Sequence, residues 1–256
     1  MRLLFFTFTA LAIVFLGIVG FHHLTRGEGP GHLSSSGFAV VELFTSEGCS
    51  SCPAADKILG RIQKEYQSGV YVLGFHVDYW DRLGWRDVYS DASYTKRQGA
   101  YASVFSLNSI YTPQVVVNGR FQFVGSDEGQ LRKTIDKELD RVASGSIDGT
   151  ASVGPNKEIE LSYEVTTKMD EWLQIALVQL NATTKVEAGE NKGRVLQHIN
   201  LVRNLRTIEV GERNGNKGSL VLSIPPDLID SDFEIIAFMQ KKKTLEIESA
   251  MKFPIR

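Results

Sequence analysis

The feature that most constrains the fold is a pair of cysteines at the junction between a predicted strand and a predicted helix. Residues 38–44, FAVVELF, form a mostly apolar run that is typical of a buried strand. Cys49 and Cys52 follow, and residues 54–66 then place apolar side chains on one helical face. A second apolar run begins at Gly69. Strand, helix and strand at this spacing predict a βαβ unit, whose crossover is right-handed almost without exception.

The residues that follow extend this unit. A helix is predicted over residues 92–105, and a hairpin is predicted to turn at Asn118-Gly119, the preferred residue pair for a type I′ turn. An amphipathic helix lies within residues 127–145, with acidic residues early and basic residues later. These elements predict an α/β domain over residues 38–145.

The sequence changes character after Gly145. Five strand-like stretches are separated by turn signals, and none shows a long helical period: ASVGPNKEIELSYEV, WLQIALVQLNA, GSLVLSI, FEIIAFMQ and LEIESAMKF. This pattern predicts an antiparallel β-sandwich domain over residues 146–256.

The N-terminus has the features of a targeting segment. Residues 3–21 carry no charge, and this apolar run is longer than that of an ordinary secretory signal. Residues 1–26 are therefore predicted to be a cleaved signal peptide or an uncleaved membrane anchor, and residues 27–37 a flexible linker. Either alternative predicts an exported protein, in the periplasm or elsewhere outside the cytosol of a bacterium.

Composition narrows the possible partners. The formal net charge is −2, so the chain lacks the basic character of a nucleic-acid-binding protein. No phosphate-binding loop or dinucleotide fingerprint is present, and no cofactor is predicted.

The chemistry of the cysteine pair is open to three interpretations. A C-x-x-C pair within a βαβ unit is typical of a redox-active dithiol, since a helix N-terminus favours the nucleophilic thiolate. A permanent structural disulfide is the second interpretation, in which the protein is a non-catalytic binding module. The third is a metal half-site, for which Cu(I) held by both thiolates and His76 fits best because soft thiolates select Cu(I). Four ligands for a closed zinc site are not apparent, so no metal is predicted in the preferred interpretation.

Three features together resemble the thioredoxin superfamily. They are the sequence CSSCP at a helix start, Thr112-Pro113 before a later strand, and the Asn-Gly hairpin. The resemblance implies a thioredoxin-like first domain, a cis bond before Pro113 and a position for this proline beside the cysteines. It also matches Glu42 to a buried acid of the superfamily, one residue further from the cysteines than usual.

The chain is similar, more specifically, to a bacterial secreted thioredoxin-like family catalogued as a domain of unknown function. The similarity covers residues 37–256 and is carried by the motifs VELFTSEGCSSCP, FHVDYWDRLGW, YTPQVVVNG and GENKGRVLQHINLVR. This similarity concerns the fold more than the function. The C-x-x-C pair in its βαβ context and the superfamily resemblance together predict an exported thiol–disulfide oxidoreductase acting on protein or small-molecule thiols and disulfides. In this reaction Cys49 attacks the substrate and Cys52 resolves the mixed disulfide.

Two further polar residues, Glu42 and His76, are candidates for the site. Glu42 alternates with apolar neighbours, so it either relays a proton to Cys52 as a buried acid or is a hydrated acid at the strand edge. His76 lies at the C-terminal end of a predicted strand, the edge of an α/β sheet at which functional sites form. Its side chain is a catalytic base, a metal ligand or a structural histidine. His198 stands among apolar residues and is expected to be part of the core.

Overall fold

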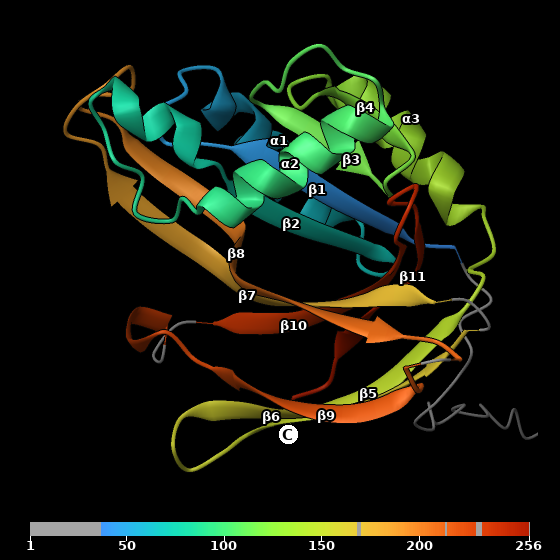
Figure 1. Ribbon diagram of the computed structural model, residues 1–256. Coiled ribbons are helices and arrows are strands. Elements are labelled where there is room, and N and C mark those ends of the chain that lie inside the picture. The colour runs from blue at the N-terminus through green and yellow to red at the C-terminus, as the bar shows by residue number, and fades with distance from the viewer. Residues whose placement is uncertain (1–36, 168–169, 213, 229–231, 256) are drawn as a thin grey trace, which may run out of the picture. The chain divides into compact units, whose positions relative to one another are not determined.

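A mixed sheet of eight strands forms the centre of the fold (Figure 1). The structure is a computed structural model, and it describes residues 37–167, 170–212, 214–228 and 232–255. A smaller antiparallel sheet has three strands. The first half contains β1 (Ala39–Thr45), α1 (Cys52–Glu65), β2 (Val70–His76), a 3-10 helix η1 (Asp78–Leu83), α2 (Ala92–Val104), β3 (Gln114–Val117), β4 (Phe121–Val124) and α3 (Glu128–Leu139). The second half contains β5 (Ser146–Val153), β6 (Glu158–Thr166), β7 (Glu171–Lys185), β8 (Val195–Val210), β9 (Lys217–Ser223), a 3-10 helix η2 (Pro226–Leu228), β10 (Phe233–Lys241) and β11 (Ile247–Phe253). The order in the large sheet is β11-β10-β7-β8-β2-β1-β3-β4, and in the small sheet β5-β6-β9.

The predicted βαβ unit is present. β1 and β2 pair in parallel through α1, and β3 adds antiparallel to the other edge of β1. α2 begins where predicted, because the side chain of its N-cap Asp91 accepts a hydrogen bond from the Ser93 amide. The β3–β4 turn has positive φ at Asn118 and Gly119, as a type I′ turn requires.

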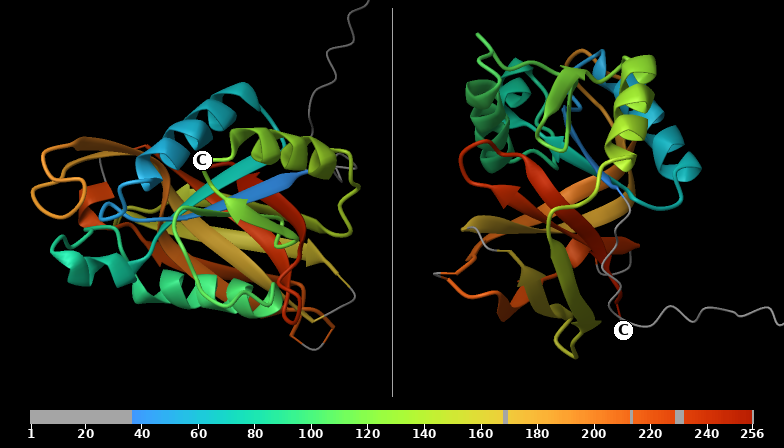
Figure 2. Two further views of the ribbon diagram at one scale, coloured as in Figure 1. Left: turned by 90° about the horizontal axis from the view of Figure 1, so that it is seen from above. Right: turned by 90° about the vertical axis from the view of Figure 1, so that its right-hand side faces the viewer.

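Alternating side chains bury both faces of the large sheet. On β1, Val41 and Leu43 pack under α1 and α3, while Val40 and Phe44 point into the opposite core with α2. Figure 2 shows α1 and α3 on one side of the sheet and α2 on the other. The two faces of β1 therefore belong to separate cores, which decides where each polar side chain of this strand can act.

The second half of the chain joins this sheet through β8. Leu201 of β8 pairs with Gly74 of β2 in parallel. A side chain at Gly74 would meet the backbone oxygens of Ile199 and Asn200 at 3.2 and 3.3 Å. The Asn200 side chain also donates to the Val72 carbonyl oxygen at 3.1 Å. The glycine thus permits a close approach of two backbones from distant parts of the sequence.

The predicted separate β-sandwich needs correction. A sandwich is present, but only its smaller layer, β5-β6-β9, is a sheet of its own. Its other layer consists of strands of the large sheet, which bury Leu173, Ile175 and Ile235 against Ile159 and Leu161 of β6. The difference arises because β8 pairs with β7 on one side and with β2 on the other. The observed fold is a mixed α/β architecture, with the C-x-x-C pair near a helix start.

The predicted targeting segment, residues 1–26, lies outside the described residues, and so does the predicted linker, residues 27–37, except for Gly37. Within the described part, no helix is both long and apolar enough to cross a membrane. The export prediction and the predicted anchor over residues 3–21 stay predictions.

A buried ion pair holds α2 against β1 and β10. The Arg97 guanidinium binds both carboxylate oxygens of Glu42, at 2.6 and 3.0 Å, and the Glu42 side chain is fully buried. The rings of Phe75, Tyr101 and Phe238 lie 5.3–5.6 Å from the guanidinium carbon. Such a bidentate pair stacked on aromatic rings compensates the desolvation of both charges.

Replacement of Arg97 by Met is expected to lower the free energy of unfolding by about 3–5 kcal/mol, because the Glu42 carboxylate is left buried without its partner. Urea unfolding measures this change. The matched control is Arg61→Met, which removes the exposed pair between Arg61 and Glu128 and should cost less than about 1 kcal/mol. Equal losses of unfolding free energy in the two variants would contradict the prediction that the buried pair stabilises the fold more than the exposed pair does.

Candidate functional site

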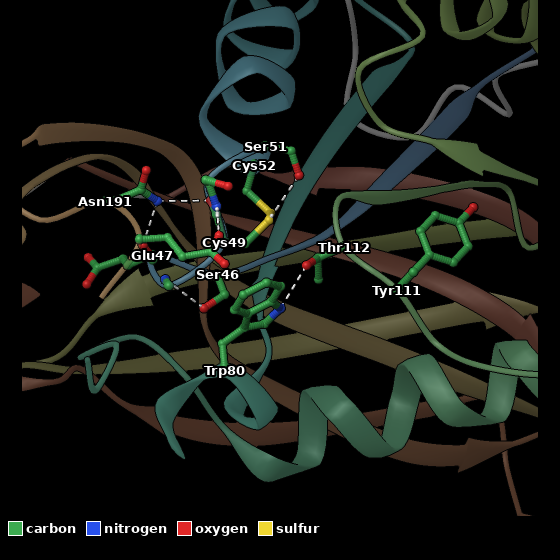
Figure 3. Close-up of a disulfide and its surroundings, with 12 residues drawn as sticks. Ser46, Glu47, Cys49, Ser51, Cys52, Trp80, Tyr111, Thr112 and Asn191 are labelled. Carbon is green, nitrogen blue, oxygen red and sulfur yellow. Dashed lines mark hydrogen bonds between the residues drawn. A yellow bond between two sulfur atoms is a disulfide. The ribbon is translucent and has the colours of Figure 1, made fainter. Parts of the chain in front are cut away.

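The two cysteines form a disulfide in the turn between β1 and α1 (Figure 3). Their Cα atoms are 5.4 Å apart, within the usual range for a disulfide. Cys52 is the first residue of α1, and Pro53 follows in the first turn, where its missing N–H costs little. Cys49 is 1% exposed and Cys52 is fully buried, whereas Ser50 and Ser51 between them are exposed.

One side of the disulfide is bordered by the segment before β3. The Thr112-Pro113 peptide bond is cis, in agreement with the sequence-based prediction. The Trp80 indole donates to the Thr112 hydroxyl at 2.8 Å, and Figure 3 shows both residues beside the sulfur atoms. A side chain at Gly125 would meet both Pro113 and Ala55 of α1 at 3.2–3.3 Å. Gly125 therefore lies close to both Pro113 and the first turn of α1.

The other side is bordered by the loop between β7 and β8. The Asn191 side-chain amide donates to the carbonyl oxygens of Glu47 and Cys49, at 2.8 and 2.9 Å. The Ser50 amide donates to the Glu190 carboxylate at 3.1 Å. This loop belongs to the β-rich half of the chain, so both halves of the sequence contribute to the surroundings of the disulfide.

Two histidine–carboxylate pairs lie in the interior next to the turn that carries the disulfide, and one of them includes Glu47 of that turn. His76 Nδ1 is 2.6 Å from Asp87, and His198 Nε2 is 3.1 Å from Glu47. The ring centroids of the two histidines are 4.8 Å apart. Glu47 also accepts from the Trp85 indole and donates its backbone N–H to Asp87, so the two pairs are linked. All four side chains of the pairs are buried.

A third carboxyl group, that of Asp56 on α1, faces this cluster. Burial raises the pKa of Asp56 to about 6, against the opposing effect of His76 and His198. Burial alone would lower the pKa of His76, but the charge and hydrogen bond of Asp87 outweigh it and the pKa is raised. The pKa of Asp87 is lowered in spite of its burial, because of the same pair.

Comparison with known proteins places the chain in a family. A family described as a protein of unknown function (DUF1223) matches residues 40–240, more than half of the chain. The chain belongs to the DUF1223 family. Among curated proteins, none matches this DUF1223 protein.

Two solved structures resemble the DUF1223 protein in fold. One is the crystal structure of an Agrobacterium tumefaciens protein, with a TM-score of 0.64 and 24% sequence identity; the match covers 84% of this chain and 93% of that one. The other is HBP35 of Porphyromonas gingivalis, with a TM-score of 0.62 and 15% identity; here 88% of this chain and 77% of the other are covered. At these identities the similarity concerns the fold alone. The chain is a DUF1223 protein of mixed α/β fold with a C-x-x-C disulfide.

The structure brings most of the predicted site residues together. Cys49 and Cys52 form the disulfide, Pro113 follows Thr112 in the segment beside it, and His76 lies in the buried cluster with His198. Glu42 does not join them: it lies on the face of β1 opposite α1 and is paired with Arg97.

Several site residues were missed at the sequence level. They are Glu47, Asp56, Asp87, Asn191 and His198, the last of which was assigned to the core. The spacing of four residues between Cys52 and Asp56 on one helix was an available signal, because it places both on the same face. For Asp87 and Asn191 no local pattern existed, since each reaches the site only through the tertiary fold.

Metal binding gains no support from the arrangement of these groups. Within the described residues, no set of three or more His, Cys, Asp and Glu side chains is placed to hold a metal ion. His76, the third ligand considered for copper, already uses Nδ1 to bind Asp87.

Substitution of Asp56 by Asn is expected to stabilise the DUF1223 protein at pH 8. The pKa of Asp56 is about 6 in the folded state and near 4 in the unfolded chain, so its ionisation opposes folding. Wild-type stability is therefore lost as pH rises from about 4 through 6, and Asn removes this loss. The gain should be about 1–3 kcal/mol at pH 8 and vanish below pH 4, as measured by urea unfolding at both pH values. A destabilised variant at pH 8 would contradict the assignment.

Proposed function

We propose that this protein is a thiol–disulfide oxidoreductase that acts through Cys49 and Cys52. The observation that carries the proposal is a C-x-x-C disulfide that links the turn after β1 to the first residue of α1. A helix N-terminus supports this chemistry because its unpaired amides and dipole stabilise a thiolate.

The proposed reaction needs no redox group other than the two cysteines and the substrate. The Cys49 thiolate attacks one sulfur of a substrate disulfide, breaks the S–S bond and releases the first substrate thiolate. The Cys52 thiolate then attacks Cys49 Sγ, forms the intramolecular disulfide and releases the second substrate thiolate. The substrate gains two electrons and the protein loses them; in the opposite direction a substrate dithiol is oxidised. The proposal places the reaction outside the cytosol, where disulfides persist.

A second candidate is a binding module with an inert disulfide. The burial of both sulfur-bearing residues favours it, since a substrate thiol must reach a group that is 1% exposed or less. The two candidates differ in one measurable property, because inert structural disulfides have reduction potentials below about −300 mV and exchange enzymes lie at about −120 to −270 mV.

Equilibration of the full-length protein with glutathione, followed by thiol trapping, measures this potential. A value between about −120 and −270 mV is expected, and its position within that range separates an oxidant from a reductant. A value below about −300 mV would support the inert disulfide and overturn the proposal.

Single replacements of the cysteines should have different effects. Cys49→Ser is expected to abolish disulfide exchange, because the attacking thiolate is lost, whereas Cys52→Ser should accumulate mixed disulfides that Cys52 can no longer resolve. Non-reducing mass spectrometry detects the trapped species, and the double variant serves as a control that traps nothing. Normal turnover by Cys49→Ser would contradict the assigned roles.

A further inference from the structure

The β7–β8 loop, residues 186–194, binds the backbone of the C-x-x-C turn through two consecutive side chains, Glu190 and Asn191. The loop is a tight hairpin, closed at its base by backbone hydrogen bonds from Gly193 to Val186 at 2.8 Å and from Val186 to Arg194 at 3.0 Å. Its tip, residues 189–194, has the sequence GENKGR. The exchange chemistry of the two cysteines does not by itself require this contact, so the loop has a role of its own at the turn.

Asn191 fixes the loop against the turn. Its side chain is fully buried, and its amide nitrogen donates to the carbonyl oxygens of Glu47 and Cys49 at 2.8 and 2.9 Å (Figure 3). Its amide oxygen accepts a hydrogen bond from Arg194 at 2.9 Å. The reversed amide would place its oxygen against two carbonyl oxygens, so one orientation satisfies all three contacts. Asn191 therefore holds the backbone of Cys49 and the loop in a single arrangement.

Glu190 brings a negative charge to the same turn. Its exposed carboxylate accepts a hydrogen bond at 3.1 Å from the amide of Ser50, the residue next to Cys49. The hydrogen bonds from Ser50 lower the pKa of Glu190, so the carboxylate is charged from pH 5 upward. A fixed charge thus lies one residue from the sulfur on which a second negative charge forms after reduction.

The Ser51 hydroxyl acts on the same sulfur in the opposite sense. It lies 3.4 Å from Cys49 Sγ. A hydroxyl that donates to a thiolate stabilises the charged form, whereas a neighbouring carboxylate disfavours it. Ser51 and Glu190 therefore have effects of opposite sign on the reduced protein, which gives the charge hypothesis an internal control.

The other charged side chains around the turn belong to the buried cluster or face it: Glu47, Asp56, His76, Asp87 and His198. On the loop itself, Arg194 is bound to Asn191. Within the described part of the chain, Glu190 is the charged group with a hydrogen bond to the segment between the two cysteines.

We propose that Asn191 and Glu190 are positioning residues that set the redox equilibrium of the Cys49–Cys52 pair. Asn191 holds the loop on the turn, and Glu190 disfavours the Cys49 thiolate. The loop thereby shifts the pair toward the disulfide and makes the reduced protein a stronger reductant. The proposal rests on the proposed redox function and gives the β-rich half of the chain a part in it.

The equilibrium concerned is the exchange with glutathione. Two glutathione thiols reduce the Cys49–Cys52 disulfide to two cysteine thiols and form one glutathione disulfide, so two electrons pass to the protein. Above its pKa, the Cys49 thiol then releases one proton. The charge of Glu190 opposes this ionisation. Its effect on the equilibrium constant is therefore absent below the pKa of Cys49 and complete above it.

Glu190→Gln in the full-length protein tests the charge, because Gln still accepts the hydrogen bond from Ser50. The glutathione equilibrium and the pKa of Cys49, followed by the ultraviolet absorbance of the thiolate, are measured from pH 5 to pH 9. Above the pKa of Cys49, the equilibrium constant for reduction should rise about threefold, as for a pair of exposed charges. This corresponds to a potential about 14 mV less negative. The pKa of Cys49 should fall, and its acid dissociation constant should change by the same factor.

Salt and two control variants separate charge from structure. In about 1 M sodium chloride the effect of Glu190→Gln should largely disappear, because the Debye length shortens to about 3 Å. Glu187→Gln removes an exposed acid from the same loop and should leave the equilibrium unchanged. Ser51→Ala should lower the equilibrium constant for reduction. An unchanged constant in Glu190→Gln above the pKa of Cys49 overturns the role of Glu190, and so does an equal change in Glu187→Gln.

Asn191→Ala tests whether Asn191 holds Glu190 in place. Without the two amide hydrogen bonds the loop is released, so Glu190→Gln should change the equilibrium by less than about 1.5-fold in this background. Asn191→Ser removes the same two amide donations with a smaller change and provides the measurement should Asn191→Ala not fold. A full threefold effect of Glu190→Gln in the Asn191 variant overturns the role of Asn191.

The outcomes also distinguish this proposal from the redox function. A wild-type potential between about −120 and −270 mV with no shift in Glu190→Gln overturns the role of the loop alone. A potential below about −300 mV that still shifts in Glu190→Gln overturns the redox function alone. A potential below about −300 mV without a shift overturns both.

Discussion

The pairing of β8 with β2 is the constraint on which the rest of this structure depends. It joins the β-rich half to the α/β half in one sheet, and the glycine at position 74 lets the two backbones approach closely. The same strand carries His198 to the cluster behind the disulfide, and the loop before it carries Asn191 to the carbonyl oxygens of the C-x-x-C turn. Without this pairing, the surroundings of the disulfide would lack both residues.

Two buried acids show how environment decides what a carboxyl group can do. Glu42 binds the Arg97 guanidinium through both carboxylate oxygens on the α2 face of β1. Asp56 lies on α1, which covers the other face of the sheet, and burial raises its pKa to about 6. The two carboxyl groups are both buried, but only Glu42 has a guanidinium partner.

The cluster behind the disulfide also shows why polar groups are retained in this interior. His76 with Asp87 and His198 with Glu47 form two linked pairs, each with good hydrogen-bond geometry. Buried pairs of this kind give little net stability compared with apolar packing. Their concentration beside a disulfide is therefore better explained by chemistry at the site than by stability of the fold.

The sequence by itself determined the local elements of this protein: the βαβ unit, the C-x-x-C pair at the helix start, the helix that begins at Ala92 and the hairpin at Asn118-Gly119. Each depends on spacing, capping or turn chemistry within a few residues. It did not reveal β8, the longest strand, because the inward positions His198 and Asn200 are polar and Asn200 has a positive φ that interrupts the alternation.

Only the tertiary structure decided which acids join the buried histidines near the disulfide and which half of the chain completes the site. The face on which Glu42 lies follows from the packing of α2, and the contact between His198 and Glu47 joins residues separated by 151 positions. Such contacts arise from strand pairing between distant segments, and no local pattern in the sequence specifies them.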